Sequence, residues 1–476
     1  MLLRVLEPIK SILLVGLVIS SVYLSGQIWL TGPASLRLPG PRSYVQEGRS
    51  DSLAMQTVIR PRLYLRDESG KWYGTVNMQG ETDDEWERIR KDLAAVPLGE
   101  AADWLSVDEQ LQPPYVRIEF PYDLTWPEWK QLWQAEGTSV TMEHASDGHA
   151  SQPSGWPKFD SIVLKPESDG SLSLMVQNDE QAWLFRGEAE GHDVVEELLM
   201  QPGEEPWVAY VESPPIPGVK WARSVLVPES PGDLRPLRAE PVRPPEAQLA
   251  RSFFSDMSVV RQGEGMNGAK LYNDGQRLLS FSSNGLVEYQ AFLSERDIAQ
   301  QSFLPGFADA SEFILQHGGW PDGLYLWNTL PIYEPGSLDL AQGDRKVLGY
   351  HFEFTWLAEG LPVIGGVLLN LGQAAGPSLP EPAGPVQVLV YNGGIQAYSS
   401  ADARLIGEGE AEPAKSLREV ISNLSVTEPL ELVDAQLIYY APPGAPWWEP
   451  AWLLRTASEG RIVLDALHGE VLMDSR

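Results

Sequence analysis

The stretch from Ser11 to Leu36 constrains the chain most, because no charged residue lies between Lys10 and Arg37. Crossing the hydrocarbon core of a bilayer takes about 20 apolar residues in a helix. Residues 11–30 supply that length and are rich in Leu, Ile and Val. The pattern therefore predicts a single N-terminal transmembrane helix at residues 11–30, preceded by a short tail at residues 1–10.

A cleaved signal peptide is the alternative interpretation of this stretch. It needs a shorter apolar region followed by a small-residue cleavage site. The small residues in Gly-Pro-Ala-Ser at 32–35 are compatible with cleavage. The bulky Ile-Trp-Leu at residues 28–30 is a poor match to the sequence that precedes a cleavage site. We expect a retained anchor with Trp29 at the membrane interface, followed by a proline-containing stalk at residues 31–50.

Four residues share one face of the predicted span: Gly16, Ser20, Tyr23 and Gln27. At about 100° per residue, they fall within about 60° of one another. Small residues let helix backbones approach closely, and an amide in hydrocarbon forms hydrogen bonds between helices. The face is interpreted as a partner-binding surface. The alternative is that Gly and Ser are ordinary in single-span helices and that Gln27 lies at the polar boundary.

The overall composition excludes several classes of function. The chain has no cysteine in 476 residues, which excludes disulfides, thiolate zinc sites and acylated cysteine anchors. Its formal net charge of −31 excludes nucleic-acid binding by the soluble part as a whole, since phosphate would be repelled. With 43% hydrophobic residues and 17 Trp, the chain beyond the stalk is long enough for more than one packed core.

This remaining part is predicted to be of the α+β class, with two or three domains built on antiparallel sheets and a few helices. Eleven prolines between residues 202 and 245 indicate a linker, in which residues 224–227 are expected to pair as an edge strand. We therefore expect an N-terminal domain at residues 51–245, a central domain at residues 246–405 and a C-terminal domain at residues 406–476.

Turn signals within the central domain predict an antiparallel meander. Asp274-Gly275 and Asn284-Gly285 each lie between apolar runs, which is typical of β-hairpin turns. The three runs that they join are Lys270–Tyr272, Leu278–Phe281 and Leu286–Tyr289.

A helix followed by antiparallel strands is expected twice in the second half of the chain. In the central domain, a helix near residues 310–317 precedes strands at 347–355 and 387–391. In the C-terminal domain, a helix opened by Pro413 precedes strands near 435–440, 451–455 and 462–464. The repeated order predicts a duplicated α+β module.

A tryptophan-rich helix is predicted near the middle of the N-terminal domain. Thr125 and Glu128 have the spacing of a capping box, and Trp126, Trp129 and Trp133 follow at helical spacing. Such a stripe could form a platform for sugars, but aromatic residues at this spacing usually pack in a core. We assign the stripe to the core.

The sequence contains no motif that marks a catalytic, metal or cofactor site. Residues 263–268 satisfy G-x-G-x-x-G but lead into a predicted hairpin strand, whereas phosphate binding needs a helix after the glycines. His144 and His149 lie in a polar loop without the spacing of a metal site. No serine lies in a nucleophile elbow. We therefore predict that the protein is not an enzyme and has no cofactor.

Several stretches together resemble the YycH family of regulatory proteins. The anchor from Ile9 to Trp29 resembles the N-terminal segment of the family, and residues 271–275 with 285–289 resemble its central strands. Further similarity lies at residues 349–352 with 360–363, and around residues 392–395. The resemblance spans the whole chain and is strongest after Val260. The proline-rich stretches at 202–245 and 373–385 are longer than the family pattern.

The resemblance implies a function in signalling at the cell membrane. Proteins of this family are attached to an essential two-component system of Gram-positive bacteria and act, with a YycI-like accessory protein, on a membrane sensor histidine kinase that controls cell-wall metabolism. It also implies that the N-terminus is cytoplasmic and that the other domains are extracytoplasmic. Charge counting around the predicted span leaves this orientation open.

Two other functions remain as alternatives. An anchored module that binds cell-wall glycan would use exposed aromatic residues such as Trp447 and Trp448. An anchored hydrolase would need two carboxylates that converge in a cleft.

Overall fold

A computed structural model provides the fold, and all the residues that it describes belong to one compact unit, Gly48–Arg476. The predicted transmembrane segment 11–30, its face of Gly16, Ser20, Tyr23 and Gln27, and the predicted stalk lie outside the described residues. The structure describes residues 60–75, 89, 105–107, 111–125, 128–129, 158–168, 170, 172–178, 182–187, 192–200, 207–242, 245–265, 268–292, 301–321, 323–334, 346–365, 383–401, 403–422, 424, 429–442, 445–458 and 460–475.

Strands dominate the described residues, so the predicted fold class, a transmembrane helix followed by α+β domains, needs correction. The structure gives bounds for 28 strands and only four helices, and the described part is therefore mostly β. Its longest bounded helix, α7 (Phe303–Gln316), has 14 residues, whereas a span needs about 20. Among the residues that the structure describes, no helix is long and apolar enough to cross a membrane.

The N-terminal sheet has nine strands, all paired antiparallel. Alternation along β1 sends Leu63 and Leu65 into the main core and Tyr64 to the opposite face. Helix α5 (His192–Met200) contacts the core face. The strand order is β10 (Leu226–Pro228), β8 (Trp207–Glu212), β2 (Trp72–Thr75), β1 (Arg62–Arg66), β4 (Tyr115–Thr125), β5 (Lys158–Pro166), β6 (Leu172–Gln177), β7 (Ala182–Gly187) and β3 (Leu105–Val107).

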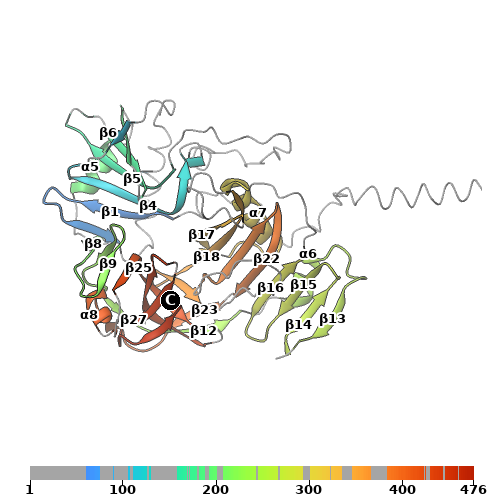
Figure 1. The fold of residues 1–476 in the computed structure, drawn as a ribbon. Coiled ribbons are helices and arrows are strands. Elements are labelled where there is room, and N and C mark those ends of the chain that lie inside the picture. Colours follow the sequence, from blue (N-terminus) through green and yellow to red (C-terminus); the bar gives the residue numbers. More distant parts are fainter. Residues whose placement is uncertain are drawn as a thin grey trace, which may run out of the picture. The chain divides into compact units, whose positions relative to one another are not determined.

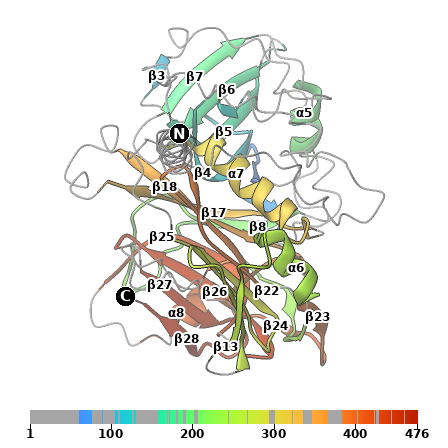
Figure 2. The same cartoon turned by 90° about the vertical axis from the view of Figure 1, so that its right-hand side faces the viewer.

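The central sheet has eight strands, and helices α6 (Glu246–Phe253) and α7 contact the sheet. Figure 1 shows α7 lying across β18 and β22, and Figure 2 shows the same helix beside β4. The strand order is β13 (Arg261–Glu264), β14 (Lys270–Asn273), β15 (Arg277–Phe281), β16 (Leu286–Ala291), β22 (Gly394–Ala401), β21 (Val386–Tyr391), β18 (Val347–Thr355) and β17 (Tyr325–Tyr333).

The predicted meander is confirmed within this sheet as β14, β15 and β16. Gly275 and Gly285 have φ angles of 92° and 89°, which only glycine adopts without strain. Strand β13 pairs with β14, so the G-x-G-x-x-G stretch lies at a hairpin and not at the start of a helix.

The C-terminal sheet also has nine strands, and in it β25 pairs in parallel with β20 and with β9. Helix α8 (Leu417–Ser422) buries Leu417, Val420 and Ile421 against one face. Along the main path the order is β19 (Leu357–Ala358), β20 (Leu361–Gly365), β25 (Leu430–Ala441), β26 (Trp447–Thr456), β12 (Leu237–Pro241) and β23 (Ala403–Gly407); β27 (Arg461–Asp465) pairs with β26, β28 (Val471–Asp474) with β27, and β9 (Val219–Trp221) with β25.

The proline-rich stretch predicted as a linker carries five strands, β8 to β12, including β11 (Asp233–Leu234), which pairs with β24 (Glu412–Pro413). Strand β10 lies at the edge of the N-terminal sheet, as predicted for residues 224–227, and an edge tolerates the missing N–H of Pro228. Strand β12 pairs with β23 and β26, so the sheets cross the predicted boundaries near 245 and 405. The division into domains stays a prediction.

A helix followed by a four-strand antiparallel meander occurs twice in the described residues. Helix α7 precedes β17, β18, β21 and β22, and helix α8 precedes β25, β26, β27 and β28. The first meander is interrupted by β19 and β20, which join the C-terminal sheet. The two segments have the same order of elements, as the predicted duplication requires.

Candidate functional site

A cavity of about 290 Å³ lies where the three sheets meet. Strands β1 and β4 of the N-terminal sheet, β17 of the central sheet, and β25 and β26 of the C-terminal sheet all contribute to its wall. Its lining includes five arginines and four carboxylates: Arg60, Arg62, Arg117, Arg223, Arg455, Glu119, Asp160, Glu212 and Asp434. In a chain with a net charge of −31, this lining is formally positive by one charge.

Strand pairing places the charged residues of the N-terminal sheet together. In the register of β1 and β4, Arg62 lies opposite Glu119 and Tyr64 lies opposite Arg117. All four side chains therefore project from one face of the sheet. The opposite face receives Leu63 and Leu65 of the main core. Alternation along β1 therefore directs Arg62 away from the main core.

The C-terminal sheet contributes a second row. Asp434 and Gln436 project from the same face of β25, and Arg455 on β26 is the cross-strand partner of Asp434. Their apolar neighbours on this face, Ile438 and Leu453, pack against Trp327 of β17 in a small separate core. The cavity lies beyond the polar end of that core.

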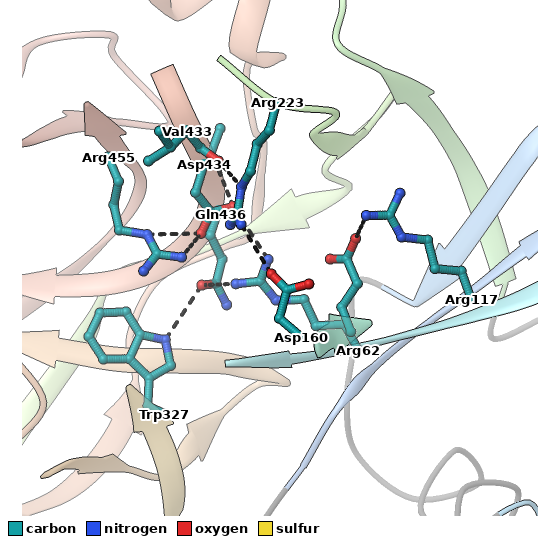
Figure 3. A network of polar contacts seen from close by, with 11 residues as sticks. Arg62, Arg117, Asp160, Arg223, Trp327, Val433, Asp434, Gln436 and Arg455 are labelled. Carbon is teal, nitrogen blue, oxygen red and sulfur yellow. Dashed lines mark hydrogen bonds and ion pairs between the residues drawn. The ribbon is translucent and has the colours of Figure 1, made fainter. Parts of the chain in front are cut away.

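Asp434 is the centre of a polar network that links the sheets (Figure 3). Its Oδ2 accepts hydrogen bonds from Nε of Arg455 at 3.1 Å and from Nη2 of the same guanidinium. Its Oδ1 accepts from the backbone N–H of Ala435 at 3.0 Å and from Arg62 Nη1 at 3.5 Å. Burial alone would raise the pKa of Asp434, but Arg455 and Arg62 hold that pKa well below its usual range.

Gln436 and Arg223 extend this network. Gln436 Oε1 accepts hydrogen bonds from Arg62 Nη2 at 2.5 Å and from the indole N–H of Trp327 at 3.4 Å. Arg223, between β9 and β10, donates from Nε to the carbonyl of Val433 at 2.6 Å and from Nη1 to Asp160 at 3.3 Å. Figure 3 shows these side chains converging from segments that are separate in the sequence. We call Arg62, Asp160, Arg223, Asp434, Gln436 and Arg455 the cavity cluster.

The cavity cluster is suited to holding charge and poorly suited to acid catalysis. A general acid in a glycosidase needs a raised pKa, whereas the pKa of Asp434 is lowered. Glu212 accepts hydrogen bonds from Trp72 Nε1 at 3.0 Å and from Ser224 at 2.5 Å. Among the residues that the structure describes, no group of three or more His, Asp or Glu side chains could hold a metal ion. The chemistry on offer is recognition by guanidinium groups.

A second charged cluster lies inside the protein, between the central and C-terminal sheets. Glu353 on β18 has no exposed surface, and its Oε1 lies 3.5 Å from Nη2 of Arg461 on β27. His351 Nε2 lies 3.2 Å from Gln387 Oε1, and burial lowers the pKa of His351 while Glu353 opposes that shift. We call His351, Glu353, Gln387 and Arg461 the buried cluster.

The buried cluster continues as a polar row across four strands. Asn328, Glu353, Gln387 and Ser399 are successive cross-strand neighbours on β17, β18, β21 and β22. Within the described residues, Asn328 Nδ2, Glu353 Oε2 and Ser399 Oγ have no hydrogen-bond partner. These polar atoms have lost their hydrogen bonds to water on folding, and no hydrogen bond within the described residues replaces them.

The aromatic residues named from the sequence have different positions. Trp448 is buried in the C-terminal core at 5% exposure, whereas Trp447 is 40% exposed, so the two do not form a joint exposed platform. Trp129 is fully buried and packs edge-to-face on Phe120, which confirms its assignment to the core. The capping box before it is also confirmed, since Glu128 accepts from both the N–H and the hydroxyl of Thr125 at 2.8 Å.

Other residues named from the sequence lie outside the described part. These are Trp126, Trp133, His144, His149 and the transmembrane face. No motif in the sequence marks the arginines of the cavity. The only local signal is the alternation of Arg60, Arg62 and Arg66 with apolar residues, and that pattern is also typical of a strand with a solvated face.

Comparisons with known proteins do not show a family for this chain. No family model and no curated protein matches it. Among solved structures, an uncharacterized protein from Eubacterium rectale ATCC 33656 is similar, with a TM-score of 0.32 and 12% sequence identity over 56% of this chain and 93% of that chain. A similarity of this size carries no argument about fold or function.

Proposed function

We propose that the protein is a non-enzymatic regulator of a membrane sensor histidine kinase that controls cell-wall metabolism. It acts with a YycI-like accessory protein at the cell membrane, and its sheets lie on the extracytoplasmic side. The resemblance of its sequence stretches to the YycH family suggests the partner and the location. The observation that carries the regulatory role is the cavity cluster, which joins the N-terminal and C-terminal sheets through charged side chains and contacts Trp327 of the central sheet through Gln436.

A regulator needs at least two arrangements that differ by only a few kcal/mol. Apolar packing between sheets resists such rearrangement because interiors are densely packed. The cavity cluster differs, since the side chains of Arg62, Arg223 and Arg455 retain 28%, 31% and 30% exposure. Guanidinium groups with access to solvent exchange partners at moderate cost. The junction of the sheets is therefore a suitable place for a conformational change.

The two alternative functions receive less support from the structure. Because Trp448 is buried, binding of glycan by the Trp447–Trp448 pair would need a rearrangement of the C-terminal core. A hydrolase would need a protonated carboxylic acid near neutral pH, and the pKa shift of Asp434 has the opposite direction.

The regulatory role is tested in a strain that lacks this protein and carries a reporter for genes under control of the kinase. Loss of the protein is expected to change reporter output, and the full-length protein should restore it. Asp434→Asn should restore it only in part, because this change removes the central anion of the cavity cluster. Lys220→Gln, in an exposed ion pair, is the control and should restore it fully. An unchanged reporter in the deletion strain would refute the proposal.

The proposed location is tested by labelling, for which the absence of cysteine is an advantage. Glu68 is exposed in the turn between β1 and β2, so Glu68→Cys provides a single reactive thiol. We expect an impermeant maleimide to label it in intact cells from which the wall has been removed. Labelling that occurs only after lysis would place this part of the chain in the cytoplasm.

A further inference from the structure

The cavity has more capacity to donate hydrogen bonds than its own carboxylates use. Arg455 engages Asp434 through Nε and Nη2, and its Nη1 makes no hydrogen bond within the described residues. Arg117 contacts Glu119 through Nη2 at 2.7 Å, while its buried Nε has no partner among the residues that the structure describes. The Nη1 group of Arg455 is therefore available to donate to an acceptor bound in the cavity.

Charge in the cavity indicates the sign of the missing acceptor. Three guanidinium groups, from Arg62, Arg223 and Arg455, act together on Asp434, and Arg455 is repelled by the other two. Burial lowers the pKa of Arg455, and this repulsion lowers it further despite the attraction of Asp434. Like charges held close together attract a counter-ion.

The walls and the size of the cavity limit what that counter-ion is. A cavity of about 290 Å³ lies at the small end of the range for ligand sites, so it matches a small molecule. Trp72, Tyr115, Tyr325 and Trp327 provide aromatic walls beside the guanidinium groups. Guanidinium groups match carboxylate and phosphate through paired N–H donors.

We propose that this cavity binds a small organic oxyanion, which carries a carboxylate or a phosphate and contacts the guanidinium groups of the cavity cluster. The anion lies among Arg62, Arg223 and Arg455, and its remaining part packs against the aromatic walls. Asp434 competes with it for the same donors. This site goes beyond the proposed regulatory function and does not rest on it. Binding of the anion can be measured on the purified chain in the absence of any kinase.

Titration calorimetry on the purified full-length chain tests the site, with succinate and inorganic phosphate as separate probes. Sodium chloride is held in excess so that ionic strength does not change during the titration. We expect saturable binding of at least one probe. Succinate alone would indicate a carboxylate ligand, and phosphate alone a phosphate ligand. Absence of saturable heat with both probes would overturn the proposal.

Two variants of opposite expected effect separate binding from folding. Arg455→Gln removes a charged donor and should weaken binding of the probe by about tenfold or more. Asp434→Asn removes the competing anion and should tighten binding by several-fold, even though it destabilises the protein. A variant that merely perturbs the fold would not bind more tightly.

The matched control is Arg404→Gln, which removes the same charge from an exposed position on β23 outside the cavity. Its affinity for the probe should equal that of the wild type. Equal weakening by Arg404→Gln and Arg455→Gln would mean that net charge alone attracts the probe, and would overturn the site. Weaker binding in Asp434→Asn would also overturn it.

Discussion

The cavity cluster and the buried cluster share one row of charged residues on the C-terminal sheet, but the two clusters differ in their access to solvent. Asp434, Arg455 and Arg461 are successive cross-strand neighbours on β25, β26 and β27. The side chain of Arg455 is 30% exposed, whereas that of Arg461 is 3% exposed and lies against fully buried Glu353. Arginines on one face of one sheet therefore lie in two environments, one open to solvent and one buried.

The difference shows that burial, and not the identity of the pair, decides what a charged contact does. In the cavity cluster, the carboxylate of Asp434 has a full set of donors, and spare donors remain on Arg455. In the buried cluster, His351 Nδ1 and Glu353 Oε2 lack hydrogen-bond partners in the described part of the chain. Breaking the buried cluster should therefore cost more, and the cavity cluster should change partners more easily.

The largest effect is expected for Arg461→Met. This change leaves the carboxylate of Glu353 buried beside no compensating guanidinium, and removing one partner of a buried ion pair typically costs about 3–5 kcal/mol. We expect the free energy of unfolding to fall by that amount, measured by urea denaturation of the purified full-length chain at pH 7.5.

The control for this prediction replaces both partners. Glu353→Met combined with Arg461→Met removes both charges at similar volume, and such exchanges are often neutral or stabilising. The double variant should recover most of the lost stability. If the single and double variants unfold at the same urea concentration, the effect comes from lost packing and not from an uncompensated charge.

A smaller effect is expected for Asp434→Asn in the cavity cluster. Water in the cavity can solvate the guanidinium groups of Arg62 and Arg455, so the loss should be about 1–3 kcal/mol. The variant should also lose less stability in acid than the wild type. Because the folded pKa of Asp434 is lowered below 3.8, its stabilisation is present above pH 3.8 and is lost as the pH falls below that value.

Urea denaturation of both proteins from pH 5 to pH 3 measures this difference. Parallel curves for the wild type and Asp434→Asn would contradict the lowered pKa. A loss as large as that of Arg461→Met would contradict the role that we assign to solvent access.

A pH-dependent effect of about 1 kcal/mol is expected for His351→Gln. Burial lowers the pKa of His351 below 6.5, and repulsion from Arg461 adds to the shift while Glu353 opposes it. Below pH 6.5 the unfolded chain therefore takes up a proton that the folded chain does not, and stability falls as the pH falls. The slope reaches at most about 1.4 kcal/mol per pH unit for one group.

Denaturation at pH 7.5, 6.5 and 5.5 compares this variant with the wild type. The free energy of unfolding should decline less between pH 6.5 and 5.5 in His351→Gln than in the wild type. Burial also lowers the pKa of His317, to about 4, so His317 contributes part of the decline in both proteins. Identical declines would mean that His351 takes up its proton without unfolding of its surroundings.

The smallest effect is expected for Lys220→Gln. Lys220 Nζ lies 2.6 Å from Glu431, but the two side chains are 69% and 46% exposed. Exposed pairs contribute little because water and salt screen them, so the free energy of unfolding should change by less than about 0.5 kcal/mol. A larger loss would show that this link between β9 and β25 depends on the ion pair and not on strand pairing.

Local signals in the sequence predicted local structure well. Asp-Gly and Asn-Gly turns at 274–275 and 284–285 predicted the meander of β14 to β16, because few residues other than glycine adopt the required backbone angles. Thr125 and Glu128 predicted a helix start, since the spacing itself places the carboxylate on the backbone donor. The periodicity of the tryptophan stripe predicted that Trp129 is buried.

The fold class and the proline-rich stretch could not be predicted in this way. Strand β12 finds its partners at β23 and β26, more than 150 residues further along the chain, and β9 pairs in parallel with the distant β25. Nothing in a short strand specifies a partner at that distance. A stretch of prolines was interpreted as a linker because proline cannot continue a sheet interior, but an edge strand and short pairings accommodate it.

The sequence by itself determined which residues are charged, where turns form and which strands have one apolar face. Only the tertiary structure decided that Arg62, Asp160, Arg223, Asp434 and Arg455 meet at one cavity, because they come from strands of two sheets and from the segment between β9 and β10. Only the tertiary structure also decided that Arg455 reaches solvent while its neighbour Arg461 does not. The free energy of a charge depends on the water and the partners around it, and both are set by segments far away in the chain.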